Sequence, residues 1–491
     1  MKQAFNFSFL NLGCTKNLVD TQYLMGNIFL LGTNNPNYNI QYISDPYDKK
    51  TEYVFLNTCG FIKSGRDEML ATIEKLLKAK KKIYLLGCGL QYFKIQNLAP
   101  LRKEEKGGFA DFLENPSIHY ISRGDRENIT IANLIKGYNS KDFSVITSPI
   151  FSNNKISPNL HQSHNLLRAY TNAAYKFEYL KIAEGCDNKC TFCIIPKLRG
   201  KQKSIPIENI LTEVKHMLAA GIEEIILIAQ DTSRYGTDLY GRPSLFKLLS
   251  EIEKIKGNFK YRLLYLYPNI ITDAVIARDE AISVSLLKEF KTLKKFIPYF
   301  DIPFQHISQH ILKKMGRLDA SKDAIHRVSY PVMIKEIKKL FPKSYLRTNI
   351  IIGFPGETEK DFQELKKFIQ ESDFDNIALF EYHDEPLATS SKLPGKISDK
   401  VIRERFMELD DIVDKKITAK EKARIGKSFT SYVMNIKSSG LGPRHSSLLV
   451  VRPSLHAPEM DPYDTISIDQ ITKIYNDTGI ISIGDKISYM H

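Results

Sequence analysis

The chain has 491 residues, of which 43% are hydrophobic and 26% charged, and its formal net charge is +14. This length exceeds what one hydrophobic core supports and predicts two to three domains. The composition is that of a soluble globular protein and excludes a disordered chain. No apolar run approaches roughly 18 residues, which excludes a membrane span, and residues 5–12 predict a strand rather than a signal peptide.

The N-terminal part alternates strand-like apolar runs with helical patterns. Residues 53–57 and 83–86 predict buried strands, and residues 67–80 repeat apolar side chains at helical spacing. This alternation predicts a Rossmann-like α/β domain over residues 1–140. Residues 141–173 lose the periodicity, are rich in Asn, Ser and Pro, and predict a linker.

Three cysteines stand apart in this first domain: Cys14, Cys59 and Cys88, each beside a glycine. Spaced cysteines are most often small buried hydrophobic residues. Here two of them closely follow predicted buried strands, and loops at the carboxyl ends of parallel strands converge on one crevice. Since glycine permits close backbone approach, the three thiolates are also candidates for an iron–sulfur cluster with one open iron.

From residue 174 the alternation resumes. Repeated strand and helix units predict a partial or full (β/α) barrel over residues 174–415. Strands are expected at residues 179–183, 222–229, 262–267, 297–302, 346–352 and 376–382. A helix over residues 207–220 carries one apolar face and is closed by Gly221.

Cys186, Cys190 and Cys193 form a C-x-x-x-C-x-x-C loop that holds half of the cysteine in the chain. Zinc loops usually use C-x-x-C pairs with a fourth ligand nearby, which is missing from this stretch. Three thiolates on one tight loop instead hold three irons of a 4Fe-4S cluster and leave the fourth open. The loop resembles that of radical S-adenosylmethionine (SAM) enzymes; the alternative is a chance meeting of three cysteines. All six cysteines fit a reducing cytoplasm.

Residues near this loop are candidates for contacts with SAM. Phe192 is expected to touch the adenine, or else to pack in the core. Gln230 and Asp231 follow a predicted strand at the barrel mouth. Either side chain is a candidate for the SAM amino group, although a plain turn also explains them.

The predicted strand over residues 346–352 adds further candidates. Arg347 has the bidentate fork that suits the SAM carboxylate. Gly353 permits close backbone approach to a ligand, or serves a tight turn alone, and Thr358 is a candidate helix N-cap. His306 is a candidate for the barrel mouth, although a lone histidine is more often structural.

The C-terminal part changes character. Residues 399–424 predict one long polar helix, and residues 424–491 contain short alternating runs that predict a small antiparallel β-barrel. This tail has seven basic and six acidic residues, so its near neutrality argues against a grip on nucleic acid. A basic run after the cysteine loop is either a solvated loop or a dock for a substrate or an electron donor. It consists of Lys197, Arg199, Lys201 and Lys203.

Together these residues resemble the methylthiotransferase family of radical SAM enzymes over nearly the whole chain. The three N-terminal cysteine motifs match at residues 13–17 (GCTKN), 57–62 (NTCGFI) and 87–88 (GC). The C-terminal barrel resembles the TRAM domain of that family, with Arg452 and residues 457–461 (APEMD) matching its late motif. Three runs are most similar to the family members that act on ribosomal protein uS12: residues 179–190, 229–232 and 262–268.

The resemblance implies SAM and two 4Fe-4S clusters, the second of them held by Cys14, Cys59 and Cys88. One SAM would methylate a sulfur at the open iron of that cluster. Another SAM would give the radical that activates the β-carbon of an aspartate in uS12, without a protein acid or base. It further implies a cytoplasmic monomer without membrane contact and a reducing electron donor such as flavodoxin or ferredoxin.

Two alternatives remain open. Other members of the family modify an adenosine next to a tRNA anticodon, and from another class the chain would be a non-catalytic iron–sulfur scaffold. A few positions also depart from the family pattern. They are Thr21 and Gln22 in place of Ser-Glu, Gly89 opening a run without the usual arginine, and His383 and Pro453 where serine is common. None is an expected cluster ligand.

Overall fold

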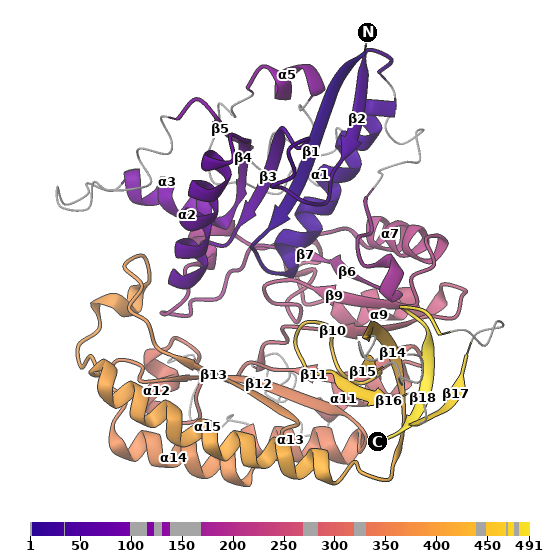
Figure 1. Cartoon of the computed structure of the whole chain (residues 1–491). Helices are drawn as coiled ribbons and strands as arrows, with labels where there is room; N and C mark the ends of the chain where they lie inside the picture. Colours follow the sequence, from indigo (N-terminus) through magenta and orange to yellow (C-terminus); the bar gives the residue numbers. More distant parts are fainter. Residues whose placement is uncertain are drawn as a thin grey trace. The chain divides into compact units, whose positions relative to one another are not determined.

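The structure is a computed structural model that describes residues 2–33, 35–98, 115–121, 130–137, 168–268, 283–318, 330–437, 448–467, 470–475 and 481–491. The chain divides into two compact units, each described below by itself (Figure 1). The first unit comprises Met1–Thr171, Ala183–Asp187 and Ile194–Ile205, and the second comprises Asn172–Ile182, Asn188–Cys193 and Pro206–His491. None of the described helices is long and apolar enough to span a membrane.

The first unit contains a five-stranded sheet in which every neighbouring pair is parallel. Its strands are β1 (Gln3–Asn11), β2 (Tyr38–Tyr42), β3 (Tyr53–Thr58), β4 (Lys82–Gly87) and β5 (Ile118–Tyr120), in the order β2-β1-β3-β4-β5. This is the 2-1-3-4-5 order of a doubly wound sheet, whereas the predicted Rossmann-like fold has the order 3-2-1-4-5-6. The strand order reverses between β1 and β3, which is the switch point where such sheets bind ligands.

Alternation along the strands explains the layers of this unit. Tyr53 and Phe55 point to one face of the sheet, where they pack with Leu24 of helix α1 (Thr15–Thr33) and with α5 (Ile131–Ile135). Val54 points to the opposite face and packs with Ile73 of α2 (Lys63–Lys78) and with α3 (Cys88–Leu98). Since successive strand side chains alternate, an apolar run without polar interruption is buried on both faces.

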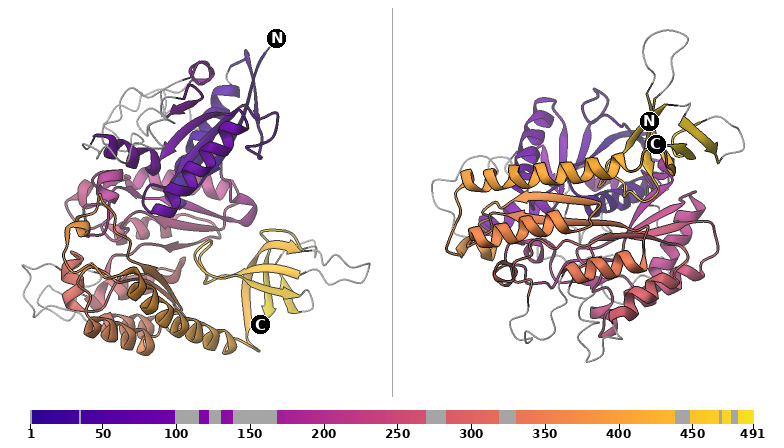
Figure 2. Two further views of the ribbon diagram at one scale, coloured as in Figure 1. Left: turned by 60° about the vertical axis from the view of Figure 1, so that its left-hand side comes forward. Right: turned by 90° about the horizontal axis from the view of Figure 1, so that it is seen from below.

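The second unit contains a six-stranded parallel sheet in the order β13-β12-β11-β10-β9-β6. Its strands are β6 (Phe177–Lys181), β9 (Glu224–Ile228), β10 (Lys260–Leu263), β11 (Phe296–Asp301), β12 (Tyr345–Ile352) and β13 (Asn376–Glu381). The main helices between and after them are α7 (Ile207–Ala219), α9 (Leu245–Lys254), α11 (Ser283–Thr292), α13 (Tyr330–Leu340), α14 (Glu359–Glu371) and α15 (Asp399–Lys422). The long helix α15 lies beside α14 (Figure 2). The predicted strand and helix alternation is therefore confirmed, with β6 and β13 at the two edges.

The second unit ends in a curled antiparallel sheet of five strands. They are β14 (Ser428–Lys437), β15 (Leu448–Pro453), β16 (Asp464–Ser467), β17 (Ile471–Ile474) and β18 (Lys486–Met490), in the order β16-β15-β14-β18-β17. The sheet is drawn in yellow in Figure 2. A register shift between Val433 and Asn435 marks a bulge in β14, and bulges increase the local twist of a strand.

Buried charges join this sheet to the parallel sheet within the second unit. Glu224 accepts hydrogen bonds from Arg262 Nε at 2.6 Å and from Arg452 Nη2 at 2.7 Å, and all three side chains are at most 1% exposed. Arg262 also donates to the carbonyls of Ser454 and Leu455, each at 2.8 Å. A carboxylate shared by two guanidinium groups is compensated in charge and in hydrogen bonds, so the contact tolerates burial.

The short strands β2, β5, β8 (Lys203–Ser204) and β17 were not predicted. Each has two to five residues, which is too short for a clear alternating pattern. The predicted linker over residues 141–173 lies mostly outside the described residues. The predicted N-cap at Thr358 is confirmed, since its hydroxyl accepts from the Asp361 amide at the start of α14.

Candidate functional site

Cys14, Cys59 and Cys88 lie at the carboxyl ends of β1, β3 and β4, three strands that are neighbours in the first unit. Cys14 immediately precedes α1, Cys59 directly follows β3, and Cys88 is the first residue of α3. Cys14 is exposed, Cys59 partly buried and Cys88 buried. The strand order therefore brings three cysteines that are far apart in the sequence to one edge of the sheet, at its switch point.

The glycines beside these cysteines serve contacts between protein loops. A Cβ on Gly60 would stand 2.2 Å from the carbonyl oxygen of Cys88, and one on Gly89 would stand 3.0 Å from the carbonyl oxygen of Cys59. A side chain at Gly60 would therefore collide with the neighbouring backbone. These two glycines let the loops of Cys59 and Cys88 pack directly against each other, which is a reason for them beyond approach to a ligand.

The side chain of Asn17, in the first turn of α1, connects the cysteine loops. Its side-chain nitrogen, Nδ2, donates to Asn57 Oδ1 and to the carbonyl of Thr58, both at 2.9 Å. Its Oδ1 lies 3.8 Å from Cys14 Sγ and 3.9 Å from Cys88 Sγ. Asn17 is 1% exposed, so the four-way contact fixes the orientation of its amide. Sequence reasoning quoted Asn17 within a motif but assigned it no role.

Arg199 of helix α6 (Ile195–Arg199) also reaches this site within the first unit. Its Nε donates to Cys88 Sγ at 3.1 Å, its Nη1 donates to Glu184 at 2.6 Å, and its Nη2 donates to Asn17 Oδ1. Arg199 is 2% exposed. The interpretation of residues 197–203 as a solvated loop is therefore wrong for Arg199, although Lys197 and Lys201 are exposed. A sequence signal existed: Arg199 is the single arginine among three lysines, and arginine suits buried ion pairs better than lysine does.

The electrostatics of the three thiols differ. Desolvation of the sulfur opposes the thiolate of Cys14, but the charges of Lys16 and Arg199 and hydrogen bonds from the Asn17 and Lys16 backbone amides together lower the pKa of this thiol. Burial raises the pKa of the Cys59 thiol, and negative charge at Cys88 and Cys14 raises it further. The guanidinium thus favours thiolates at this end of the sheet.

The described residues contain no group of three or more His, Cys, Asp and Glu side chains that would hold a single metal ion. An iron–sulfur cluster takes one cysteine at each of three irons, so its thiolates stand farther apart than the ligands of one ion. Three thiols at neighbouring strand ends, two of them beside Asn17, with a buried guanidinium to balance thiolate charge, fit a cluster of this kind.

The C-x-x-x-C-x-x-C loop is divided between the units, because Cys186 clusters with the first and Cys190 and Cys193 with the second. In the second unit, Arg317 Nη1 lies 3.6 Å from Cys190 Sγ, and its guanidinium stacks 4.0 Å from the ring centroid of Tyr267. The Tyr267 hydroxyl is 3.7 Å from the same sulfur. Arg317 and Tyr267 were missed, because nothing in the sequence links residues 267 and 317 to a cysteine at position 190.

Asp231 lies directly beyond β9 and holds the cysteine loop within the second unit. Its Oδ2 accepts from the side-chain amide of Asn188 at 2.7 Å, and its Oδ1 accepts from the amide of Ser233 at 3.0 Å. Burial raises the pKa of Asp231 despite these hydrogen bonds. Asp231 thus contacts both the cysteine loop and its own turn, through Asn188 and Ser233, while Gln230 beside it is partly buried.

Of the other predicted SAM contacts, Arg347 lies in β12, Gly353 directly follows β12, and Phe192 lies in the cysteine loop. Phe192 packs edge-on against Phe354, with ring centroids 6.5 Å apart. Arg347, in β12, donates to Asp301 at 2.9 Å. Gly353 has a positive φ of 79°, and a Cβ there would stand 2.4 Å from Ile402 of α15. Each has a protein partner in the structure, and their roles toward SAM remain predictions.

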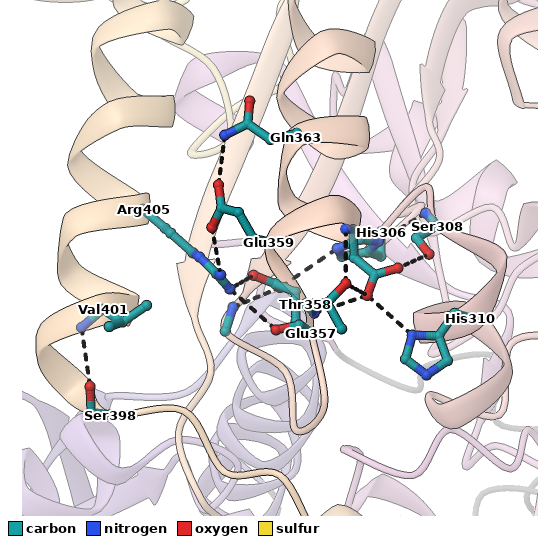
Figure 3. A network of polar contacts seen from close by, with 12 residues as sticks. His306, Ser308, His310, Glu357, Thr358, Glu359, Gln363, Ser398, Val401 and Arg405 are labelled. Carbon is teal, nitrogen blue, oxygen red and sulfur yellow. Dashed lines mark hydrogen bonds and ion pairs between the residues drawn. The ribbon is translucent and has the colours of Figure 1, made fainter.

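His306 belongs to a buried polar network at the end of β12 rather than to an open barrel mouth (Figure 3). Its Nδ1 accepts from the amide of Ser308 at 2.9 Å, so its Nε2 carries the proton and faces Glu357 at 3.6 Å. Glu357 in turn accepts from Arg405 at 2.7 Å and from the Gly353 amide at 2.9 Å. The network anchors the turn that contains Gly353 onto α15, which supports the structural interpretation of His306.

The comparisons with known proteins agree with this arrangement. The model of the Radical SAM superfamily matches residues 180–369, and that of Uncharacterized protein family UPF0004 matches residues 6–106. Ribosomal protein uS12 methylthiotransferase RimO of Carboxydothermus hydrogenoformans is 34% identical over 92% of this chain and 91% of that protein. The RimO proteins of Clostridium kluyveri and Chlamydia abortus are 36% and 31% identical, over 86% and 98% of this chain and 84% and 93% of theirs.

The chain belongs to the RimO family. The predicted resemblance to radical SAM methylthiotransferases is therefore confirmed, and RimO relatives span its two units. The radical SAM methyltransferase TsrM from Kitasatospora setae, solved with cobalamin and a [4Fe-4S] cluster, shares 10% identity at a TM-score of 0.51. The alignment covers 79% of this RimO-family chain and 74% of TsrM, and it concerns the fold alone.

Proposed function

We propose that this RimO-family chain adds a methylthio group to the β-carbon of an aspartate in ribosomal protein uS12. The observation that carries the proposal is its similarity, over more than four-fifths of both chains, to relatives named for this activity. The position of Cys14, Cys59 and Cys88 at three adjacent strand ends supports it, because the activity needs a sulfur carrier beside the radical SAM site.

We assign one 4Fe-4S cluster to Cys186, Cys190 and Cys193 and a second to Cys14, Cys59 and Cys88. When bound, the first supplies the electron that cleaves SAM, and the second carries the sulfur that is transferred. The SAM contacts are assigned to Phe192, Gln230, Asp231, Arg347 and Gly353.

The residues of the chain prepare these sites. Asp231 holds Asn188, which keeps the loop between Cys186 and Cys190 attached to the end of β9. Arg317 places positive charge at the sulfur of Cys190, and Arg199 does the same at Cys88. Both guanidinium groups are buried, so their attraction for thiolate sulfur is weakly screened by water.

We further propose that the curled C-terminal sheet over residues 424–491 is a TRAM β-barrel, and that the parallel sheet over residues 174–415 is a partial (β/α) barrel. The bulge in β14 and the order of the six parallel strands support these assignments. The chain would act as a cytoplasmic monomer with flavodoxin or ferredoxin as electron donor.

Mass spectrometry of uS12 and of bulk tRNA from a strain lacking this gene tests the proposal. The expected result is loss of a methylthio group from uS12 with unchanged tRNA. Loss from tRNA alone would overturn it in favour of a tRNA-modifying enzyme. Purified protein, reduced anaerobically with dithionite, is also expected to form 5′-deoxyadenosine from SAM, whereas a non-catalytic scaffold would form none.

A further inference from the structure

Arg199 has an unusual set of partners within the first unit. It is buried, it donates to a cysteine sulfur at 3.1 Å, and a buried carboxylate, Glu184, binds the other side of its guanidinium at 2.6 Å. The side chains of the pair are 1% and 4% exposed. A guanidinium keeps its proton in such a site, so the charge near Cys88 is permanent.

Two explanations compete for this arrangement. Arg199 and Glu184 would form a purely structural ion pair if their only task were to hold α6 against β7 (Ala183–Glu184). A structural pair needs no sulfur partner. Arg199, however, donates from Nε to Cys88 Sγ and from Nη2 to the side-chain amide oxygen of Asn17. That oxygen lies near the sulfurs of both Cys14 and Cys88. Two of its three hydrogen bonds therefore face the cysteines.

Hydrogen bonds to the sulfurs and nearby charge set the reduction potential of an iron–sulfur cluster. Reduction adds one negative charge. A positive guanidinium that donates to a ligand sulfur stabilises the reduced form more than the oxidised form, and Glu184 opposes this effect. The two residues should therefore shift the potential in opposite directions, which a merely structural pair would not do.

We propose that Arg199 is a positioning residue that raises the reduction potential of the cluster held by Cys14, Cys59 and Cys88, and that Glu184 limits this rise. The proposal rests on the assignment of the second cluster under the proposed function. Arg199 follows Cys193 by a few residues in the sequence. One chain segment thus carries ligands of one cluster and sets the charge at the other.

The test uses the full-length chain with Cys190→Ala and Cys193→Ala, which leaves only the second cluster. Dithionite donates one electron to this cluster, with no bond formed or broken, while electron paramagnetic resonance follows the potential. Arg199→Gln is expected to lower the equilibrium constant for reduction about tenfold or more, which is ~59 mV for one electron. Glu184→Gln is expected to raise it. Arg199→Lys keeps the charge but not the fork, so a smaller fall is expected.

Lys201→Gln is the matched control, because Lys201 lies on the same segment, is exposed, and undergoes the same change of charge. Lys201→Gln should change the equilibrium constant for reduction of the cluster by less than about twofold. An Arg199→Gln potential equal to that control would overturn the proposal, as would shifts of one sign in Arg199→Gln and Glu184→Gln.

Iron content separates this inference from the proposed function. If Arg199→Gln binds no cluster, the opposite shifts of Arg199→Lys and Glu184→Gln decide, and unchanged potentials in both would overturn the proposal. If the Cys190→Ala/Cys193→Ala protein itself binds no 4Fe-4S cluster, the second cluster is refuted, and the role of Arg199 is refuted with it.

Discussion

Each of the two cysteine sites has a buried arginine beside one of its sulfurs, but the partners of the two guanidinium groups differ. At Cys88 the guanidinium of Arg199 is matched by a buried carboxylate, Glu184, and by the amide oxygen of Asn17. At Cys190 the guanidinium of Arg317 lies over the ring of Tyr267 and donates to the carbonyl of Pro303. A ring face and a carbonyl attract a cation without cancelling its charge. The guanidinium at Cys88 is thus paired with a carboxylate, whereas the partners of Arg317 at Cys190 include a ring face and a backbone carbonyl.

This difference fits the two roles. In the proposed function, the site at Cys190 would attract electrons and the carboxylate of SAM, which a nearby positive charge favours. The site at Cys88 would hold sulfur and then release it, which suits a guanidinium whose charge is offset by a carboxylate. Four experiments test this difference between the two sites, and their expected effects decrease in the order given.

Removal of ligands should separate the two sites completely. Cys190→Ala/Cys193→Ala is expected to abolish formation of 5′-deoxyadenosine, whereas Cys14→Ala/Cys59→Ala should retain it and abolish methylthio transfer to uS12. Either pair should reduce the iron content from about eight to about four per chain, measured after anaerobic reconstitution. Methylthio transfer by the Cys14→Ala/Cys59→Ala protein would show that the sulfur comes from elsewhere.

Arg317→Gln tests the positive charge beside the sulfur of Cys190. Loss of a partner beside a metal-bound sulfur typically costs about 10–100-fold, and we expect a loss of that size in single-turnover SAM cleavage. Arg317→Lys should lose less, because the charge survives. The control is Arg403→Gln, since the Arg403 side chain is 64% exposed and pairs with Glu381 at the surface. Equal rates in Arg317→Gln and Arg403→Gln would contradict an electrostatic role.

Glu224 provides the comparison without sulfur, because its two arginines, Arg262 and Arg452, donate to this carboxylate and to backbone carbonyls. Glu224→Gln leaves Arg262 and Arg452 buried with one neutral partner and should destabilise the second unit by ~3–5 kcal/mol. Thermal unfolding followed by circular dichroism measures this loss. The cluster spectra of the folded protein should stay unchanged, and a spectral change would mean that the charges communicate with the clusters.

Asp361 is a carboxylate stabilised mainly by neutral donors, and it should give the smallest effect. Although burial opposes it, hydrogen bonds from Ser308 and Thr358 hold the pKa of Asp361 well below its usual value. A depressed pKa gives stability that is present above the ordinary aspartate pKa and is lost as the pH falls toward the folded value.

Asp361→Asn should therefore cost about 1 kcal/mol at neutral pH, as loss of a helix cap does. It should also flatten the fall in stability between about pH 4 and pH 2, measured by urea unfolding at several pH values. If the free energy of unfolding of Asp361→Asn fell as steeply below about pH 4 as that of the unmodified protein, other carboxylates would control acid unfolding.

Much of the fold follows from local pattern. The buried runs at β3 and β4 each contain four successive apolar residues, so they predicted strands within one or two residues of the observed bounds. Helix α7 ends at Ala219, and Gly221 beyond it takes a φ of 80°, as the helix-closing interpretation requires. The short β17 has no such signal, because four residues carry too little periodicity to stand out from a loop.

The candidate site divides in a similar way. The alternation of strands and helices was sufficient to expect Cys14, Cys59 and Cys88 at strand ends, since loops after parallel strands share one edge. The actual order of the strands, with the reversal between β1 and β3, was not predicted. Strand order depends on which apolar faces pack together, and the sequence pattern is nearly the same for several orders.

The sequence by itself determined the C-x-x-x-C-x-x-C loop and the resemblance to the family, because ligands within eight residues stay close in any fold. Only the tertiary structure decided which charges meet the sulfurs. Arg199 and Cys88 are 111 positions apart, and Arg317 and Cys190 are 127 apart. Contacts between residues so far apart in the sequence arise from packing of whole elements. The sequence pattern around a basic loop residue does not indicate whether its side chain lies in water or against a thiolate.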